Sequence, residues 1–235
     1  MGDGDAKDAG MRPSIIANPK SQIQLVVFDA GGVLVRICHG GWTEVCGRLG
    51  IAPPAEFAAE ALLPRLTEIG AAFETGRIDE AAFIERVAQV SGFAAEHIVA
   101  ALDAWLIEPY AGVDAFLECV ADTGVTTAVL SNTNATHWRL MTTESHAGIP
   151  VHRVHHLFTS FQIGALKPEA AVYEHVERVT GAAPRSILFF DDHRPNIEAA
   201  RQRGWQAVRI DHDGDPVGQM TEHLVSVGLL NGGDV

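Results

Sequence analysis

Short and nearly continuous apolar runs recur along the chain, and polar residues follow most of them. The runs cover residues 23–28, 126–131, 187–191 and 206–210, with a weaker one at 155–159. Unbroken runs of this length are typical of strands buried on both faces of a parallel sheet. Helical patterns separate them at 113–122, 169–180 and 196–203, each followed by a glycine stop signal. This alternation predicts a doubly wound, mainly parallel, Rossmann-like α/β core.

The segment 36–110 breaks this rhythm, because it contains no run typical of a buried strand. Its apolar residues follow helical spacing instead, which predicts helices at 42–49, 54–70, 79–91 and 94–105. We interpret it as a helical cap domain inserted after the first strand. The core then comprises residues 22–35 and 111–235, with a further helix at 218–227. The polar, glycine-containing residues 1–21 predict a disordered leader.

Composition narrows the classes of partner. The chain has 235 residues, of which 47% are hydrophobic, and its formal net charge is −13. That charge repels nucleic acids and anionic membranes, so we expect neither as a partner. The three cysteines lack CxxC spacing, and no signal peptide or membrane-spanning run of about 20 residues is visible. We therefore expect a cytoplasmic protein, with monomer and homodimer both open.

Chemically useful side chains stand at the ends of the apolar runs, where open α/β sheets bind their ligands. Asp29 can attack phosphorus and help to hold Mg²⁺, while Ser131 and Asn132 offer a hydroxyl and an amide to anionic oxygens. Lys167 precedes Pro168 at a predicted helix start and can neutralise a carboxylate and a phosphoryl oxygen. Alone, Asp29 also fits a loop cap, Ser131 and Asn132 a helix N-cap, and Lys167 a solvated surface residue, so it is their shared position that predicts a site.

The adjacent acids Asp191 and Asp192 are the strongest single signal. Two carboxylates directly after an apolar strand are costly to bury without a partner. Mg²⁺ is a natural partner, since it takes one or two carboxylates together with phosphate and water. The histidines between residues 146 and 156 show no regular ligand spacing and are interpreted as ordinary loop residues.

Four segments resemble the motifs of the haloacid dehalogenase-like (HAD) hydrolase superfamily, subfamily I (IA). They are Phe28-Asp29-Ala30-Gly31-Gly32-Val33-Leu34, Leu130-Ser131-Asn132-Thr133-Asn134, Lys167-Pro168-Glu169 and Phe189-Phe190-Asp191-Asp192. Within it, the chain is similar to the bacterial α-D-glucose-1-phosphate phosphatase group. The resemblance implies a Mg²⁺-dependent phosphatase that hydrolyses a small phosphorylated metabolite, with a sugar phosphate among the candidates.

The same resemblance implies roles for individual residues. Asp29 would form an aspartyl-phosphate intermediate with help from Lys167. The metal would be held by Asp29, the backbone carbonyl of Gly31, and Asp192, with Asp191 assisting. The phosphoryl oxygens would be bound by Ser131, Asn132 and Lys167.

Gly31 is a departure from the family pattern, because most family phosphatases carry a proton-transferring Asp there. General acid–base help is worth about 10²–10⁴-fold. Water, His137, Glu74 and Arg77 are open as replacements, and the candidates for substrate specificity are Glu74, Arg77, Asn134 and His137. The alternative is a catalytically impaired protein that binds a phosphate ligand or regulates. A 2-haloacid dehalogenase would share the fold but leave the Asp191–Asp192 pair unexplained.

Overall fold

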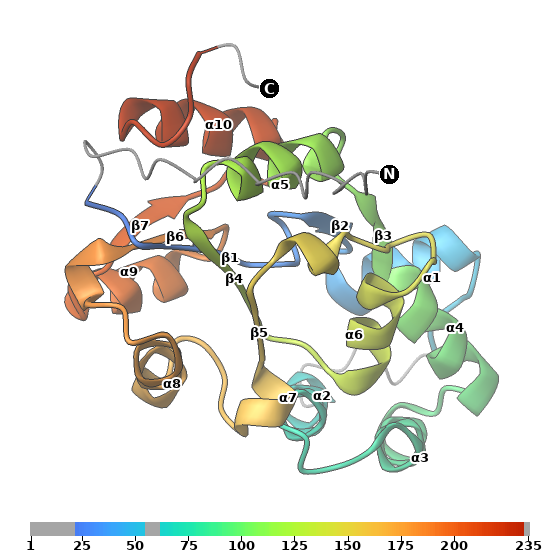
Figure 1. Cartoon of the computed structure of the whole chain (residues 1–235). Coiled ribbons are helices and arrows are strands. Elements are labelled where there is room, and N and C mark those ends of the chain that lie inside the picture. Colours follow the sequence, from blue (N-terminus) through green and yellow to red (C-terminus); the bar gives the residue numbers. More distant parts are fainter. Residues whose placement is uncertain (1–21, 55–61, 233–235) are drawn as a thin grey trace, which may run out of the picture.

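A five-stranded parallel sheet forms the centre of the protein in the computed structural model, which describes residues 22–54 and 62–232 (Figure 1). The strand order is β5-β4-β1-β6-β7. The strands are β1 (Leu25–Phe28), β4 (Thr126–Ser131), β5 (His156–Thr159), β6 (Ile187–Asp191) and β7 (Gln206–Arg209). The predicted parallel core is confirmed, and the predicted leader at 1–21 lies outside the described residues.

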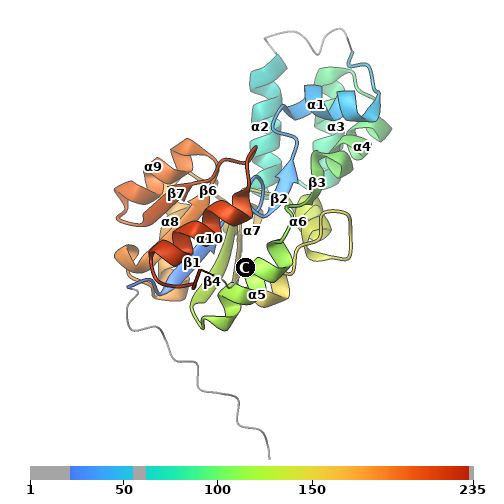
Figure 2. The same ribbon diagram turned by 90° about the horizontal axis from the view of Figure 1, so that it is seen from above.

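Helices cover both faces of the sheet (Figure 2). One face is covered by α5 (Val113–Asp122) and α10 (Pro216–Ser226), the other by α8 (Ala170–Thr180) and α9 (Arg194–Gln202). Successive strand side chains point to opposite faces, so Val26 and Phe28 pack in the first apolar cluster, and Leu25 and Val27 in the second. Burial on both sides explains why the sequence of β1 is apolar without alternation.

The register of the three central strands brings their carboxyl ends to one edge. Phe28 lies opposite Val129 of β4 on one side and Phe190 of β6 on the other. The next residue, Asp29, donates its backbone N–H to the carbonyl of Phe190 at 2.9 Å. Residues one or two positions beyond the paired ones therefore meet at this edge.

A helical insertion follows β1, as the sequence predicts. It comprises α1 (Gly41–Leu49), α2 (Leu62–Glu74), α3 (Glu80–Ser91) and α4 (Ala95–Trp105) and has its own apolar cluster, which includes Phe73, Phe83 and Ile98. The Asp79 side chain caps α3 by accepting the Ala82 N–H at 2.9 Å. Residues 55–61 of the predicted 54–70 helix lie outside the described part of the chain. In Figure 2 the insertion stands beside the carboxyl edge of the sheet.

Two short, partly buried strands at the ends of the segment 36–110 were not predicted from the sequence. β2 (Val35–Ile37) and β3 (Leu106–Pro109) pair antiparallel at the junction of insertion and core. Strands of three and four residues are too short to show a two-residue period. Helices α6 (Ala135–Thr142) and α7 (Ser160–Ile163) were also not predicted from the sequence. Within the described ranges, no helix has both the length and the apolar character that crossing a bilayer requires.

Candidate active site

Lys167 lies at the centre of a buried polar cluster at this edge. Its ammonium Nζ is 2.8 Å from Asp29 Oδ2, 2.7 Å from Asp191 Oδ2 and 2.9 Å from the carbonyl oxygen of Leu130. Only 1% of the Lys167 side chain is exposed. Asp29 follows β1, Asp191 ends β6, and Lys167 precedes α8, so the fold brings these three predicted residues together.

Asp191 is held from several directions. Besides the Lys167 ammonium, its carboxylate accepts the His193 N–H at 2.8 Å and the Asn196 side-chain amide at 3.0 Å. A carboxylate with this many charged and neutral donors is fixed in orientation. Asp192 is the more open neighbour, with 13% of its side chain exposed. Asp191 is thus placed to position the Lys167 ammonium, whereas the Asp192 carboxylate faces the site.

The cluster carries more negative than positive charge. Carboxylate oxygens of Asp29, Asp191 and Asp192 lie within 4.8 Å of one another. Burial raises the pKa of Asp29, and although Lys167 opposes this, Asp191 and Asp192 raise the pKa further. Burial also opposes the charge on Lys167, but the carboxylates of Asp191 and Asp29 outweigh it and raise its pKa.

These oxygen donors fit a hard divalent cation such as Mg²⁺, which would offset the excess negative charge. The backbone also approaches the site closely at Gly32, whose φ is 75°. A Cβ at this position would overlap Oδ2 of Asp192. Glycine is therefore required here by both the backbone conformation and the space beside the carboxylate.

The Asn132 side chain binds the backbone of Lys167, a contact that the sequence did not indicate. Its side-chain oxygen accepts the backbone N–H of Lys167 at 2.8 Å, and its amide nitrogen donates to the Lys167 carbonyl at 2.9 Å. This pair holds the loop that presents the lysine. Because the amide is engaged at both ends, the predicted contact between the Asn132 side chain and phosphate stays a prediction. Ser131 is buried at the end of β4.

A cavity of about 600 Å³ lies between this edge and the insertion. Gly31, Ser131 and Asn132 line it on the core side. Apolar side chains form most of the remaining wall, among them Ile37, Trp42, Phe73, Leu102, Trp105 and Met141. The cavity can therefore hold the organic part of a ligand whose polar end meets the cluster around Lys167.

Glu74, at the end of α2, also lines this cavity. Burial raises its pKa to about 7, so near neutral pH a large fraction of the carboxyl retains its proton. The hydroxyl of Ser160 donates to the backbone carbonyl of Glu74 at 2.6 Å and accepts the N–H of Thr133 at 2.9 Å. Ser160 thereby ties the end of α2 to the loop after β4. No sequence motif indicated Ser160, because its role depends on contacts between distant segments.

The other three specificity candidates are placed differently. Asn134 and His137 line the cavity, but Asn134 caps α6 by accepting the His137 N–H at 2.9 Å. His137 Nε2 donates to the Leu102 carbonyl at 2.9 Å, its Nδ1 lies 3.2 Å from the Asn134 amide nitrogen, and burial lowers its pKa to about 4. Arg77 lines a separate cavity of about 430 Å³ on the insertion and donates to the Thr75 hydroxyl. His137 and Arg77 are thus poorly placed to transfer a proton.

Comparison with known proteins identifies the family. The haloacid dehalogenase-like hydrolase family matches residues 23–204, and the chain belongs to it. "Phosphatase MT3486" of Mycobacterium tuberculosis (strain CDC 1551 / Oshkosh) is 32% identical over 74 residues, which are 32% of this chain and 34% of that protein. "Enolase-phosphatase E1" of Parvibaculum lavamentivorans is 44% identical over 50 residues, 21% of each chain. The matched segments span about a third and about a fifth of these relatives.

Solved structures support the fold. A HAD family enzyme from Bacteroides thetaiotaomicron has a TM-score of 0.71 at 21% identity, covering 84% of this chain and 98% of that one. The same enzyme in complex with magnesium and inorganic phosphate has a TM-score of 0.68 at 22% identity, covering 82% and 96%. L-2-haloacid dehalogenase from Xanthobacter autotrophicus, with chloropropionic acid covalently bound, has a TM-score of 0.56 at 21% identity, covering 88% and 84%. At these identities the likeness concerns the fold, a core with a helical insertion.

Proposed function

We propose that this protein is a Mg²⁺-dependent phosphatase that hydrolyses a small phosphorylated metabolite through an aspartyl-phosphate on Asp29. The observation that carries the proposal is the buried pair of Asp29 and Lys167 beside the carboxylates of Asp191 and Asp192. Membership of the HAD-like hydrolases supports it. A structural neighbour that binds magnesium and inorganic phosphate is consistent with it.

The reaction divides into two displacements at phosphorus. A carboxylate oxygen of Asp29 forms a bond to phosphorus, the bond to the ester oxygen breaks, and that oxygen takes up a proton. Water then attacks the phosphoryl group, loses a proton, and releases inorganic phosphate with Asp29 restored. Lys167 stabilises negative charge on the phosphoryl oxygens, while Asp191 keeps the lysine in place. Ser131 is assigned to the same oxygens.

The residues suited to hold Mg²⁺ are Asp29, Asp192 and the backbone carbonyl of Gly31, with Asp191 assisting. When bound there, the ion would supply positive charge that stabilises the phosphoryl oxygens during transfer. A side chain at Gly32 would displace Asp192 from this position, so the glycine leaves room for the acidic loop beside Asp29. The three acidic side chains would then carry less uncompensated charge than they do with Lys167 alone.

Glu74 is our candidate for the proton donor that Gly31 cannot provide. It lines the same cavity as Gly31, and its raised pKa of about 7 retains a transferable proton near neutrality. A general acid works best when its pKa lies near the working pH. In the second displacement the deprotonated Glu74 would accept the proton of the attacking water.

We take residues 36–110 as the cap domain that selects the substrate. Most of the cavity wall that it contributes is apolar, including Trp42 and Phe73. A sugar phosphate, which the likeness to the glucose-1-phosphate phosphatase group favours, would place its hydroxyls against a wall with few polar side chains, among them Thr43, Thr67 and Glu74. Buried hydroxyls without hydrogen bonds are costly. An apolar ester group is therefore the better match within the proposed activity.

The test is Mg²⁺-dependent release of phosphate from p-nitrophenyl phosphate, whose leaving group needs no protonation. We expect turnover by the wild-type protein, loss with Asp29→Asn, and retention with the matched control Asp122→Asn at the exposed end of α5. Wild-type turnover no higher than that of Asp29→Asn would refute the phosphatase proposal.

The glycine at position 31, where most family phosphatases carry a proton-transferring Asp, favours one alternative function. In this alternative the chain is a phosphate-binding or regulatory protein that does not hydrolyse its ligand. Binding of inorganic phosphate by the wild-type protein with Mg²⁺, combined with no hydrolysis of any ester in a phosphometabolite screen, would support it. Hydrolysis that depends on Asp29 would exclude it.

A further inference from the structure

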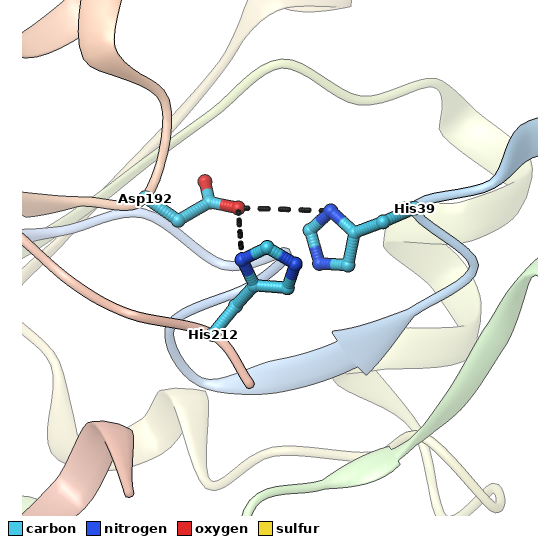
Figure 3. A group of neighbouring side chains, drawn as sticks. All are labelled: His39, Asp192 and His212. Atoms are coloured by element: carbon cyan, nitrogen blue, oxygen red, sulfur yellow. Dashed lines mark ion pairs between the residues drawn. The ribbon is translucent and has the colours of Figure 1, made fainter. Parts of the chain in front are cut away.

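Two histidines from distant parts of the sequence meet at Asp192 (Figure 3). His39 lies just after β2 and His212 lies in the loop after β7. The Nδ1 atom of each ring is 3.8 Å from the same oxygen, Oδ2 of Asp192. The ring centroids are 3.6 Å apart, with 38° between the ring planes. Neither histidine lines the large cavity.

The distances are too long for direct hydrogen bonds, which span about 2.7–3.2 Å for nitrogen donors. They are closer to the spacing of donor atoms around a shared ion. Zinc binds imidazole nitrogen at about 2.0–2.1 Å and carboxylate oxygen at about 2.0–2.2 Å, so two ligand atoms in a tetrahedral site lie about 3.3–3.5 Å apart. A closing movement of about half an ångström would bring each Nδ1 to that spacing from Asp192 Oδ2, and the three ligand atoms lie within 4.8 Å of one another.

The backbone on each side of the group is anchored. The Tyr110 hydroxyl donates to the His212 carbonyl at 2.9 Å, and the N–H of Cys38 donates to the Trp105 carbonyl at 2.9 Å. Arg209 donates to the Asp192 carbonyl at 3.1 Å. Two loops and one strand end are therefore held so that their side chains converge.

A further carboxylate stands behind one of the rings. Asp213 Oδ1 is 3.7 Å from Nε2 of His212, the ring nitrogen that does not face Asp192. Metal-binding histidines commonly direct their second ring nitrogen to a carboxylate, which fixes the orientation of the ring. At 3.7 Å, and with 89% of its side chain exposed, Asp213 stands near this outer position without forming a hydrogen bond to the ring.

We propose that His39, His212 and Asp192 form a second cation site that takes a transition-metal ion of the zinc class. Two imidazole nitrogens and one carboxylate oxygen suit zinc, copper or nickel, whereas Mg²⁺ prefers oxygen ligands. Three protein ligands leave a further position for water. Asp192 also belongs to the proposed magnesium set, so an ion held by the histidines competes for it and inhibits phosphate release. The binding itself does not depend on the proposed function; the inhibition does.

The direct experiment measures zinc binding to the untagged full chain in excess Mg²⁺, by competition with a chromophoric chelator. We expect one zinc ion per chain, with the affinity lowered in His39→Ala and in His212→Ala by more than the roughly 10–100-fold that loss of an outer partner costs. The control His97→Ala removes an exposed histidine of α4 and should leave the affinity unchanged. Asp29→Asn should also retain zinc.

Two outcomes would overturn the site. Equal zinc affinity in the wild-type protein and both histidine variants would show that the rings are not ligands. Loss of zinc binding in Asp29→Asn alone would place the ion among the carboxylates instead. A second readout is zinc inhibition of p-nitrophenyl phosphate hydrolysis, which both histidine variants should relieve. Inhibition that is unchanged in both variants would overturn the competitive role, while a chain without phosphatase activity would leave the binding result intact.

Discussion

The ammonium nitrogen of Lys167 lies 2.8 Å from the carboxylate of Asp29, and both side chains are almost completely buried. Removing one partner of such a pair leaves an unpaired charge, which costs more than the pair itself contributes. Without the ammonium group of Lys167, the negative charge of three neighbouring carboxylates, those of Asp29, Asp191 and Asp192, would not be offset by this lysine. The relationship therefore connects the stability of the core with the proposed binding of Mg²⁺.

Lys167→Met should abolish phosphatase activity and lower the free energy of unfolding by about 3–5 kcal/mol in the absence of a divalent metal. Added Mg²⁺ should restore part of the loss, because it offsets the negative charge of the carboxylates. Thermal unfolding with and without Mg²⁺ measures both effects. Arg194→Met, which removes a surface pair with Glu198, is the control and should change stability by less than about 1 kcal/mol. An equal loss in both variants would contradict the prediction.

Substitutions of the adjacent acids Asp191 and Asp192 should have different effects on stability and on Mg²⁺ dependence. Asp192→Asn should raise the Mg²⁺ concentration needed for half-maximal activity with little effect on unfolding, because its carboxylate meets His39 and His212 only at 3.8 Å. Asp191→Asn should lower the free energy of unfolding by about 1–3 kcal/mol, since it replaces one of the two acceptor oxygens by an amide donor and removes the charge that faces Lys167. Magnesium titrations and denaturant unfolding distinguish the two. Similar destabilisation by both substitutions would show that the roles are not separated.

Glu74→Gln should lower the hydrolysis rate of alkyl phosphates by about 10²–10⁴-fold and that of p-nitrophenyl phosphate much less. In the wild-type protein the rate with alkyl esters should fall as the pH rises through about 7, where Glu74 loses its proton. Glu74→Gln should lack that alkaline decline. Glu68→Gln, an exposed position on the same helix, is the matched control. An unchanged pH profile in Glu74→Gln would remove Glu74 from the reaction.

The same carboxyl should affect stability with a defined sign. Its pKa rises from 4.5 to about 7 in the folded chain, so between these values the folded protein holds a proton that the unfolded chain has lost. The free energy of unfolding therefore decreases as the pH rises through this window. Glu74→Gln should remove this decrease, on the order of 1–2 kcal/mol for a partly exposed group. Denaturant unfolding at pH 5 and pH 8 tests it, and an equal pH dependence of both proteins would contradict it.

Gly31→Asp should restore the missing proton-transfer group and speed hydrolysis of alkyl phosphates more than of esters with good leaving groups. The new Cβ would lie 3.1 Å from Cδ1 of Ile37, so the end of that side chain must shift slightly. Gly31→Asp combined with Ile37→Val should relieve the contact. Gly31→Ala adds the same Cβ without a carboxyl and should give no gain. Equal rate changes for alkyl phosphates and p-nitrophenyl phosphate would refute the leaving-group explanation.

Much of the parallel sheet could be predicted from the sequence. The apolar runs that became β4 and β6 are bounded correctly because both strands are buried on two faces and admit few polar positions. Parallel strands bring their carboxyl ends to one edge, so the meeting of Asp29, Ser131 and Asp191 follows from topology. Very short elements such as β2 escaped because three residues carry no measurable period.

The tertiary structure decided which of the remaining polar residues act together. From sequence, Glu74, His137 and Arg77 were equivalent candidates; packing of the insertion places Glu74 in the cavity, engages both ring nitrogens of His137 and directs Arg77 elsewhere. His39 and His212 meet only because two loops converge beside Asp192. A local pattern can reveal strand ends and motifs, but pKa shifts and ligand distances arise from burial and from contacts between segments far apart in the chain.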